Sequence, residues 1–308
     1  MTPLRQALAD YLVMRRALGF KLERAEKLLA QLLGYLEEVG AETLTNEHAL
    51  AWARLPAGGS VNWWAQRLTV TRGFARYLQA IDVAAEVPPW DLLPTRPRRA
   101  TPYLYSDEDL AALIAATGGL RFPLRAATYE TLIGLLAVSG LRVGEALRLD
   151  RDDLDLEHEL LVVRGSKFGK SREIPLHESA VQALRGYLKR RDRPQPAPRT
   201  PAVFISTTGR RLSHGSVGGT FRQLVRGAGL KPRSACCRPR LHDLRHTFAV
   251  RTLIDCYRGG GDAAVRLPLL STYLGHVDPA ATYWYLSAAP ELLGLAAGRL
   301  EESLGGRS

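Results

Sequence analysis

The sequence contains few cysteines and no long apolar run, and these absences exclude several classes of protein. Its three cysteines are odd in number and lack the spacing of zinc ligands, which argues against both a disulfide framework and a metal finger. We expect Cys236, Cys237 and Cys256 to be reduced thiols. The apolar run "LIGLLAV" soon meets Ser139 and Gly140, so it is far shorter than the roughly 20 residues of a membrane span.

Signals for export, repeats and metal sites are also missing. The opening "MTPLRQALAD" has early charges and neither the apolar core nor the small-residue cleavage site of a secretory signal. The chain shows no repeat at a solenoid period and no low-complexity tract. No cluster of Asp, Glu or His has metal-ligand spacing, so we expect no metal and no other cofactor. We therefore predict a protein that stays in the cytoplasm and has no membrane partner.

Positive charge, by contrast, is abundant and concentrated. The formal net charge of +11 favours a polyanionic partner, most simply nucleic acid. Residues 1–90 carry ten basic and nine acidic residues, whereas residues 222–251 carry eight basic residues against one acid, Asp243. The eight are Arg222, Arg226, Lys231, Arg233, Arg238, Arg240, Arg245 and Arg251. This focus predicts a surface that faces phosphates, and a merely solubilising arginine-rich surface is the alternative.

The length of 308 residues predicts two domains. In residues 1–90, leucines such as Leu28, Leu32 and Leu36 recur at helical spacing and indicate a helical bundle. The stretch "VPPWDLLPTRPRRATP" then has five prolines and three arginines in sixteen residues, which disfavours helices and packing. We predict a linker over residues 91–102 and a second domain over residues 103–308.

The second domain is expected to be mainly helical with a small antiparallel β-sheet. It opens with "YSDEDLAALIAA", where Ser106 and Asp109 have the spacing of a capping box. Midway, "DLDLEHELLVVRGSKFGKSREIPLH" alternates and is rich in Val and Ile, which predicts a short antiparallel meander with "GSKFGK" between its last two strands. Helical periodicity then resumes and ends in an amphipathic tail helix at about residues 290–304.

Several stretches of this domain carry candidate functional residues. In "SGLRVGEALRL", Arg142 follows a Ser-Gly break at the start of a helix, where backbone amides already favour anions. In "LHDLRHTFAV", His242 and Arg245 lie three residues apart and share a helical face. Lys167 falls at the hairpin tip, and His276 closes "LGH". Taken singly, each has an ordinary explanation: a surface arginine, a common pair, a solvated lysine, or a structural histidine.

Tyrosines cluster around His276. Tyr283 and Tyr285 follow it by seven and nine residues in "TYWYLS", and Tyr273 precedes it. A tyrosine is usually a packing residue with a polar tip. We expect Tyr273 to pack and one of the later two to do chemistry.

The ordered set resembles the tyrosine recombinase family, also called the phage integrase family: an arginine after "SGL", a lysine hairpin, H-x-x-R-H-T-F, "LGH", and a tyrosine nine residues later. The resemblance spans about residues 103–290, and the N-terminal part is similar in size and position to the family's SAM-like core-binding domain. It implies the catalytic residues Arg142, Lys167, His242, Arg245, His276 and the nucleophile Tyr285. Glu145 resembles the family's acidic residue, and Lys170 and Tyr283 stay open as alternatives to Lys167 and Tyr285.

This set also suits phosphodiester cleavage on physical grounds. Two arginines can stabilise the charge on the non-bridging oxygens of a five-coordinate phosphorus without a metal. A phenol with a pKa of about 10 needs a base or a strongly positive site, which His242 and the arginines can supply. A lysine with a lowered pKa can protonate the leaving sugar oxygen. The phosphotyrosine ester conserves the energy of the bond, so a different DNA 5′-hydroxyl can rejoin the strands without ATP.

The resemblance further implies a homotetramer on two double-stranded DNA sites, companion recombinases, and docking of the tail helix on a neighbouring protomer. We expect a site-specific recombinase or integrase with a 3′-phosphotyrosyl intermediate. One alternative is a type IB topoisomerase-like enzyme, against which the separate N-terminal bundle and the tail argue. The other is a DNA-binding regulator that has lost catalysis, against which the complete residue set argues.

Overall fold

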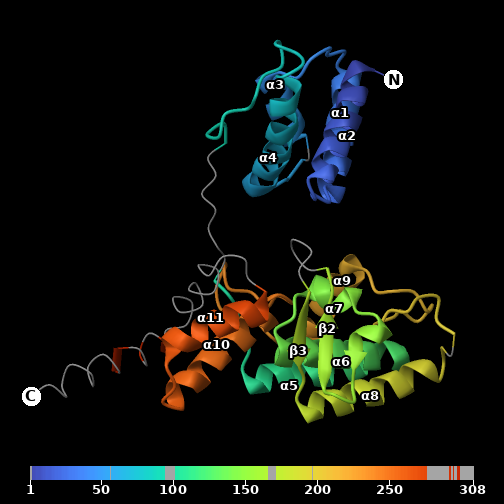
Figure 1. The fold of residues 1–308 in the computed structure, drawn as a ribbon, viewed down its shortest axis with the longest axis vertical. Coiled ribbons are helices and arrows are strands. Elements are labelled where there is room, and N and C mark those ends of the chain that lie inside the picture. Colours follow the sequence, from blue (N-terminus) through green and yellow to red (C-terminus); the bar gives the residue numbers. More distant parts are fainter. Residues whose placement is uncertain are drawn as a thin grey trace, which may run out of the picture. The chain divides into compact units, whose positions relative to one another are not determined.

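The computed structural model describes residues 2–55, 57–93, 101–165, 171–195, 197–275, 291–292, 294 and 297–298. The chain divides into two compact units, residues 1–99 and 100–308, and Figure 1 shows the elements of each. Of the predicted linker, residues 94–100 lie outside the described residues. The expected architecture, mainly helical with a small antiparallel sheet, is confirmed.

Unit 1 is built from helices that bury a leucine stripe. Its described helices are α1 (Pro3–Ala17), α2 (Glu23–Glu38), α3 (Asn46–Arg54) and α4 (Val61–Leu78). The stripe of α2, with Leu32 and Leu36 fully buried, packs into one core with residues of the other three helices. The helical periodicity of the leucines therefore predicted the buried face correctly.

Unit 2 places one apolar helix at its centre. Its elements are α5 (Asp107–Ala116), η1 (Thr117–Gly119), α6 (Pro123–Ser139), α7 (Val143–Arg148), η2 (Arg151–Asp153), β1 (Leu154–Asp155), β2 (Leu160–Val163), β3 (Arg172–Pro175), α8 (Glu178–Asp192), α9 (His214–Gly227), α10 (Asp243–Arg258) and α11 (Ala263–Leu274). Helix α6 packs against α5, α8 and α10, which fits its apolar residues on most sides. The main core of the unit therefore surrounds α6.

Helix α6 ends at a glycine that no other residue can replace easily. Gly140 has φ +60°, in the left-handed region that favours glycine. A Cβ at this position would also overlap the ring of Phe248. The chain can therefore turn sharply here and lead directly into Leu141 and Arg142.

The sheet is the predicted meander, with antiparallel strands in the order β1-β2-β3. Leu161 pairs with Ile174, and Val163 pairs with Arg172. Ile174 is buried and Glu173 is exposed, as expected from the alternation of side chains along a strand. Residues 166–170, which include the predicted hairpin tip, lie outside the described residues.

The first residues of unit 2 run along α10. The backbone N–H of Tyr105 donates to Oγ1 of Thr247 at 3.0 Å, and the Tyr105 hydroxyl donates to the carbonyl of Arg240 at 3.0 Å. In turn, Nη2 of Arg251 donates to the Tyr105 carbonyl at 2.9 Å. Tyr105 is itself buried. The segment around Tyr105, where the chain enters unit 2, is therefore hydrogen-bonded to α10 and to the turn before it.

Helix α5 follows at once and begins with the predicted capping box. The Asp109 backbone N–H donates to Oγ of Ser106, and the Ser106 N–H donates to Oδ2 of Asp109, both at 3.1 Å. These two bonds satisfy N–H groups that the first turn of a helix leaves unpaired. The local sequence signal is confirmed.

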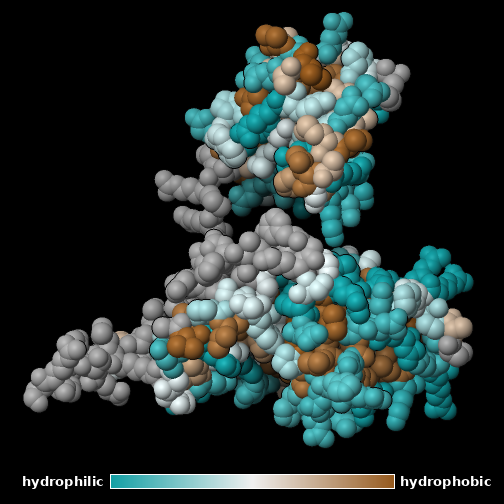
Figure 2. Space-filling model, in the orientation of Figure 1, coloured by the Kyte–Doolittle hydropathy of each residue, from teal (hydrophilic) through white to brown (hydrophobic). Residues whose placement is uncertain are grey.

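Helices α10 and α11 form a second apolar cluster with an open surface. Val265 and Leu269 on α11 are exposed, and Figure 2 shows brown, apolar surface over α10 and α11. Leu292 is buried in the same cluster, and Nη2 of Arg258 donates to Oε1 of Glu291 at 2.6 Å. Most of the predicted tail helix, residues 290–304, lies outside the described residues, but 291–292, 294 and 297–298 are helical. Among the helices that the structure describes, none could span a bilayer.

Candidate active site

Arg142 stands where the sequence predicts it, at the start of a helix. It is the N-cap residue of α7 and follows the turn at Gly140. Its Nη1 donates to Oε1 of Glu145 at 2.8 Å, and its backbone N–H donates to Oε2 of the same carboxylate at 3.0 Å. Its Nη2 donates to the carbonyl of Gly275 at 3.0 Å. The guanidinium is therefore held from two directions.

His242 and Arg245 occupy the start of α10. His242 is the N-cap residue, and Arg245 lies in the first turn, where it is 2% exposed. Nη1 of Arg245 donates to the Gly140 carbonyl at 2.8 Å, and Nη2 donates to the Leu274 carbonyl at 2.7 Å. The buried arginine thus ties α10 to the ends of both α6 and α11.

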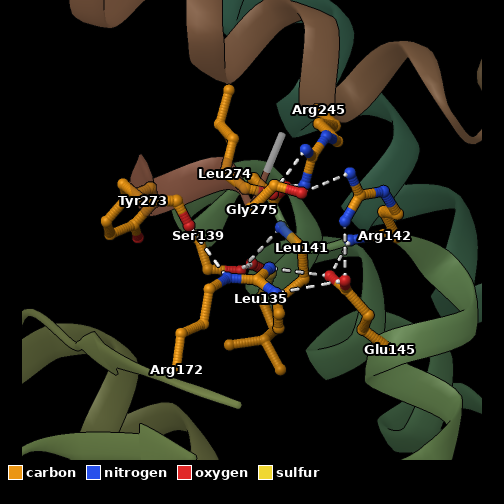
Figure 3. Close-up of polar contacts among 11 residues, drawn as sticks. Leu135, Ser139, Leu141, Arg142, Glu145, Arg172, Arg245, Tyr273, Leu274 and Gly275 are labelled. Carbon is orange, nitrogen blue, oxygen red and sulfur yellow. Dashed lines mark hydrogen bonds and ion pairs between the residues drawn. The ribbon is translucent and has the colours of Figure 1, made fainter. Parts of the chain in front are cut away.

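Three guanidinium groups converge on the last carbonyls of α11 (Figure 3). Helix C-termini carry unpaired carbonyls and the negative end of the helix dipole, so cations are stabilised there. Consecutive carbonyls each accept a hydrogen bond from a different arginine: Tyr273 from Arg172 (2.9 Å), Leu274 from Arg245 (2.7 Å) and Gly275 from Arg142 (3.0 Å). We call this arrangement the carbonyl clamp. It brings the two predicted catalytic arginines, Arg142 and Arg245, to the carbonyl oxygens of the two residues that precede His276 in the sequence.

Glu145 is the carboxylate that balances this positive charge. Its side chain is 2% exposed and forms ion pairs with Arg142 and Arg172. Burial acts to raise the pKa of Glu145, but hydrogen bonds from the Arg172 side chain and the Arg142 backbone outweigh it and lower the pKa to about 2. Glu145 is therefore ionised at neutral pH and fixes the orientation of both guanidinium groups.

Arg172 is a site residue that the sequence analysis missed. It lies on β3 two residues before the buried Ile174, so the period of the strand places both side chains on one face. Its side chain is 13% exposed. The signal that could have found it was this alternation in "REIP", which puts an arginine where an apolar residue is expected.

His242 lies in a strongly positive setting. Removal from water lowers its pKa to about 4, and the charges of Arg245, Arg142 and Arg240 act in the same direction. The residue as a whole remains exposed, so solvent weakens these charge effects. A neutral imidazole at pH 7 can accept a proton.

A cavity of about 650 Å³ opens beside Arg142 and His242. Arg148 and His214 also line it, and neither was singled out from the sequence. The cavity places a recess next to one predicted catalytic arginine and the predicted base. Such a recess can receive a phosphate group.

Tyr273 packs, as predicted. Its ring stacks on Phe248, with 5.6 Å between ring centroids and 22° between planes. Burial raises the pKa of Tyr273 to about 12, so its phenolate form is disfavoured. Its side chain belongs to the core around α10 and α11.

Lys167 and its alternative Lys170, together with His276 and the tyrosines Tyr283 and Tyr285, lie outside the described residues. Within the part of the chain that is described, no group of three or more His, Cys, Asp or Glu side chains could hold a metal ion. The structure shows no disulfide among Cys236, Cys237 and Cys256.

The basic stretch of residues 222–251 is mostly on the surface. Arg245 is buried and Arg251 is partly buried. Six residues are exposed: Arg222, Arg226, Lys231, Arg233, Arg238 and Arg240. Two of the six form ion pairs with acids of unit 2, Arg233 with Asp109 and Arg240 with Asp243. A positive surface therefore flanks the helix that carries Arg245.

Comparison with known proteins identifies the family. The model of the phage integrase family matches residues 105–291. The protein y4rB of Sinorhizobium fredii is 46% identical over 98% of each chain, and the tyrosine recombinase XerC of Azotobacter vinelandii is 31% identical over 83% of this chain and 81% of its own. The Tn1549 transposon integrase, solved in complex with a circular intermediate DNA, has a similar fold, with a TM-score of 0.64 at 19% identity over 96% of this chain and 99% of that one. The resemblance predicted from the motifs is confirmed, and the chain belongs to the phage integrase family of tyrosine recombinases.

Proposed function

We propose that this chain cleaves and rejoins DNA strands at specific sites through a 3′-phosphotyrosyl intermediate, with Tyr285 as the nucleophile. The observation that carries the proposal is the convergence of Arg142 and Arg245 on the adjacent carbonyls of Gly275 and Leu274, at 3.0 and 2.7 Å. Two cations fixed at neighbouring positions can stabilise the charge that develops on one phosphodiester. Membership in the family supports the same activity.

The scissile phosphate is assigned to the cavity of about 650 Å³ beside Arg142. The Arg142 side chain lines this cavity and is 31% exposed, so DNA can reach it. Arg245 is buried and bonded to Gly140 and Leu274. It contributes a cation whose position is fixed before DNA arrives, so little reorganisation is needed in the transition state.

In the cleavage step, the Tyr285 oxygen bonds to phosphorus and the bond between phosphorus and the 5′-oxygen breaks. His242, which is neutral at pH 7 because its pKa is lowered, accepts the phenolic proton. Lys167, or Lys170 in its place, gives a proton to the departing 5′-oxygen, and His276 helps to orient the phosphate. Attack by the 5′-hydroxyl of another strand reverses these steps and releases the tyrosine.

The substrate is double-stranded DNA carrying two recombination sites, and the active assembly is a tetramer of this chain or of this chain with companion recombinases. The six exposed cations of residues 222–251 support a phosphate-binding surface. The bundle of unit 1 is assigned to DNA binding as the core-binding domain. Because the substrate is DNA, the protein is expected to work in the cytoplasm.

The test is a cleavage assay on nicked duplexes that cover the DNA flanking the gene. After cleavage next to a nick, the short strand diffuses away and the covalent complex accumulates. We expect an adduct that survives SDS on a denaturing gel and is absent from Tyr285→Phe. The adduct should also form in EDTA, because none of the proposed steps uses a metal ion.

Tyr283→Phe is the matched control and should form the adduct normally. An adduct that persists in Tyr285→Phe but disappears in Tyr283→Phe would move the nucleophile to Tyr283. Relaxation of supercoiled DNA without any recombinant product would favour the topoisomerase-like alternative. DNA binding without an adduct on any of the duplexes would favour the catalytically silent regulator.

A further inference from the structure

Arg172 contacts both groups that hold the Arg142 guanidinium. We propose that Arg172 is a positioning residue: it fixes Glu145 and the end of α11, and through them it sets the orientation of Arg142. This inference rests on the proposed function and adds to it a residue outside the motif set. Arg172 acts without touching the phosphate, since its donors point at protein oxygens (Figure 3).

The first anchor is Glu145. Arg172 donates to both carboxylate oxygens of Glu145, from Nη1 to Oε1 at 3.2 Å and from Nη2 to Oε2 at 2.8 Å. Arg142 uses the same two oxygens through its Nη1 and its backbone N–H. The pair of hydrogen bonds from Arg172 fixes the plane of the Glu145 carboxylate. It therefore also fixes the direction in which this carboxylate holds Arg142.

The second anchor is the last turn of α11. Nε of Arg172 donates to the Tyr273 carbonyl at 2.9 Å. The same guanidinium lies against Gly275, where an added Cβ would come within 3.0 Å of Nη1 and 3.2 Å of Cζ. Gly275, at φ +65°, presents its carbonyl to Nη2 of Arg142. Arg172 thus fixes the position of the second acceptor of Arg142 as well.

A lysine cannot replace Arg172 in this role. The three hydrogen bonds leave the planar guanidinium in fixed directions and reach two acceptor groups at once, the Glu145 carboxylate and the Tyr273 carbonyl. An ammonium group is a point charge without this fork. Arg172→Lys therefore keeps the positive charge of the site but loses the simultaneous hydrogen bonds to Glu145 and Tyr273.

The experiment measures single-turnover cleavage of a nicked duplex by the full-length protein and, separately, DNA affinity. For Arg172→Lys we expect a cleavage rate about 100-fold lower, the size of loss that misplacement of a catalytic group can produce, and unchanged DNA affinity. The matched control is Arg190→Lys on α8, which alters an exposed arginine paired with Glu130 at 3.0 Å and should cleave normally. A DNA affinity that falls in step with the rate would make Arg172 a DNA contact and overturn the proposal.

A double-mutant cycle separates positioning from a general structural role. If Arg172 acts through Arg142, the variant with both arginines changed to lysine cleaves no more slowly than Arg142→Lys alone. Additive losses would overturn the proposal. Absence of an adduct from the unmodified protein would refute the proposed function instead, whereas wild-type cleavage by Arg172→Lys would refute only the positioning.

Gly275→Ala gives an independent check if Arg172→Lys does not fold. Its methyl group presses on the Arg172 guanidinium, and the left-handed φ of +65° strains the backbone that carries the Gly275 carbonyl. The variant therefore disturbs Arg172 and the end of α11 together, without changing any charge. We expect slower cleavage at unchanged DNA affinity. A wild-type cleavage rate in Gly275→Ala would show that the position of Arg172 does not matter for the reaction.

Discussion

Replacing Glu145 by glutamine removes the carboxylate that pairs with both Arg142 and Arg172 while keeping the size of the side chain. Both ion pairs are at 2.8 Å, and the carboxylate is 2% exposed. Glu145→Gln leaves two guanidinium groups beside an amide, of which only the oxygen can accept. We expect a folded protein with a less stable unit 2.

The expected loss of stability follows from the pKa of Glu145, which is about 2 against an ordinary value of 4.5. This difference corresponds to about 3 kcal/mol of unfolding free energy at pH 7, near the lower end of the loss seen when a buried ion pair loses one partner. Because the folded-state pKa is lowered, the stabilisation is present above pH 4.5 and is lost as the pH falls towards 2. At pH 3.5 the deficit of Glu145→Gln should be smaller by about 1 kcal/mol.

The measurement is urea denaturation followed by far-UV circular dichroism at pH 7 and at pH 3.5. Tryptophan fluorescence serves as an internal control, because four of the five tryptophans, Trp52, Trp63, Trp64 and Trp90, belong to unit 1. Most of the fluorescence transition should therefore not move, and only the contribution of Trp284 in unit 2 should. Glu173→Gln, at an exposed position on the same strand as Arg172, is the matched control and should lower stability little. A deficit under 1 kcal/mol at pH 7, or one that grows on acidification, would refute the reasoning.

Two further predictions concern pH and salt. Because the pKa of His242 is lowered from 6.5, the single-turnover cleavage rate should stay level from pH 8 to 6 and fall only at lower pH; an acid limb centred at or above pH 6.5 would contradict the assignment of His242 as the base. Arg226→Gln, at an exposed position on α9, should lower the slope of log Kd against log salt concentration by about 1, the contribution of one phosphate contact. Arg190→Gln should leave this slope unchanged. An unchanged salt slope in Arg226→Gln would mean that this part of the basic stretch does not face phosphate.

Local signals in the sequence were enough to predict the elements of the site. The capping box at Ser106, the alternation of the meander, and the break before Arg142 are short-range features, and each is found in the fold. The spacing of His242 and Arg245 predicted a shared helical face, and both residues lie at the start of α10. These features depend on backbone geometry within a few residues, which the sequence encodes directly.

The carbonyl clamp could not be predicted in the same way. It joins Arg142 to a carbonyl 133 residues away and Arg172 to one 101 residues away. Its acceptors are backbone oxygens, which every residue carries, so no side-chain pattern marks them. The alternation of β3 places Arg172 on the same inward face as the buried Ile174, but its partners Glu145 and Tyr273 are distant in the sequence.

The contacts of Tyr105 have a mechanical consequence. Its backbone and hydroxyl are bonded to Thr247 on α10 and to Arg240 just before it, and Arg251 returns a bond to its carbonyl. Tension passed along the chain from residues 1–99 is therefore delivered to α10, the helix whose first turn holds Arg245. Under the proposed function, in which unit 1 binds DNA, a force on unit 1 would reach the Arg245 guanidinium through covalent and hydrogen bonds alone.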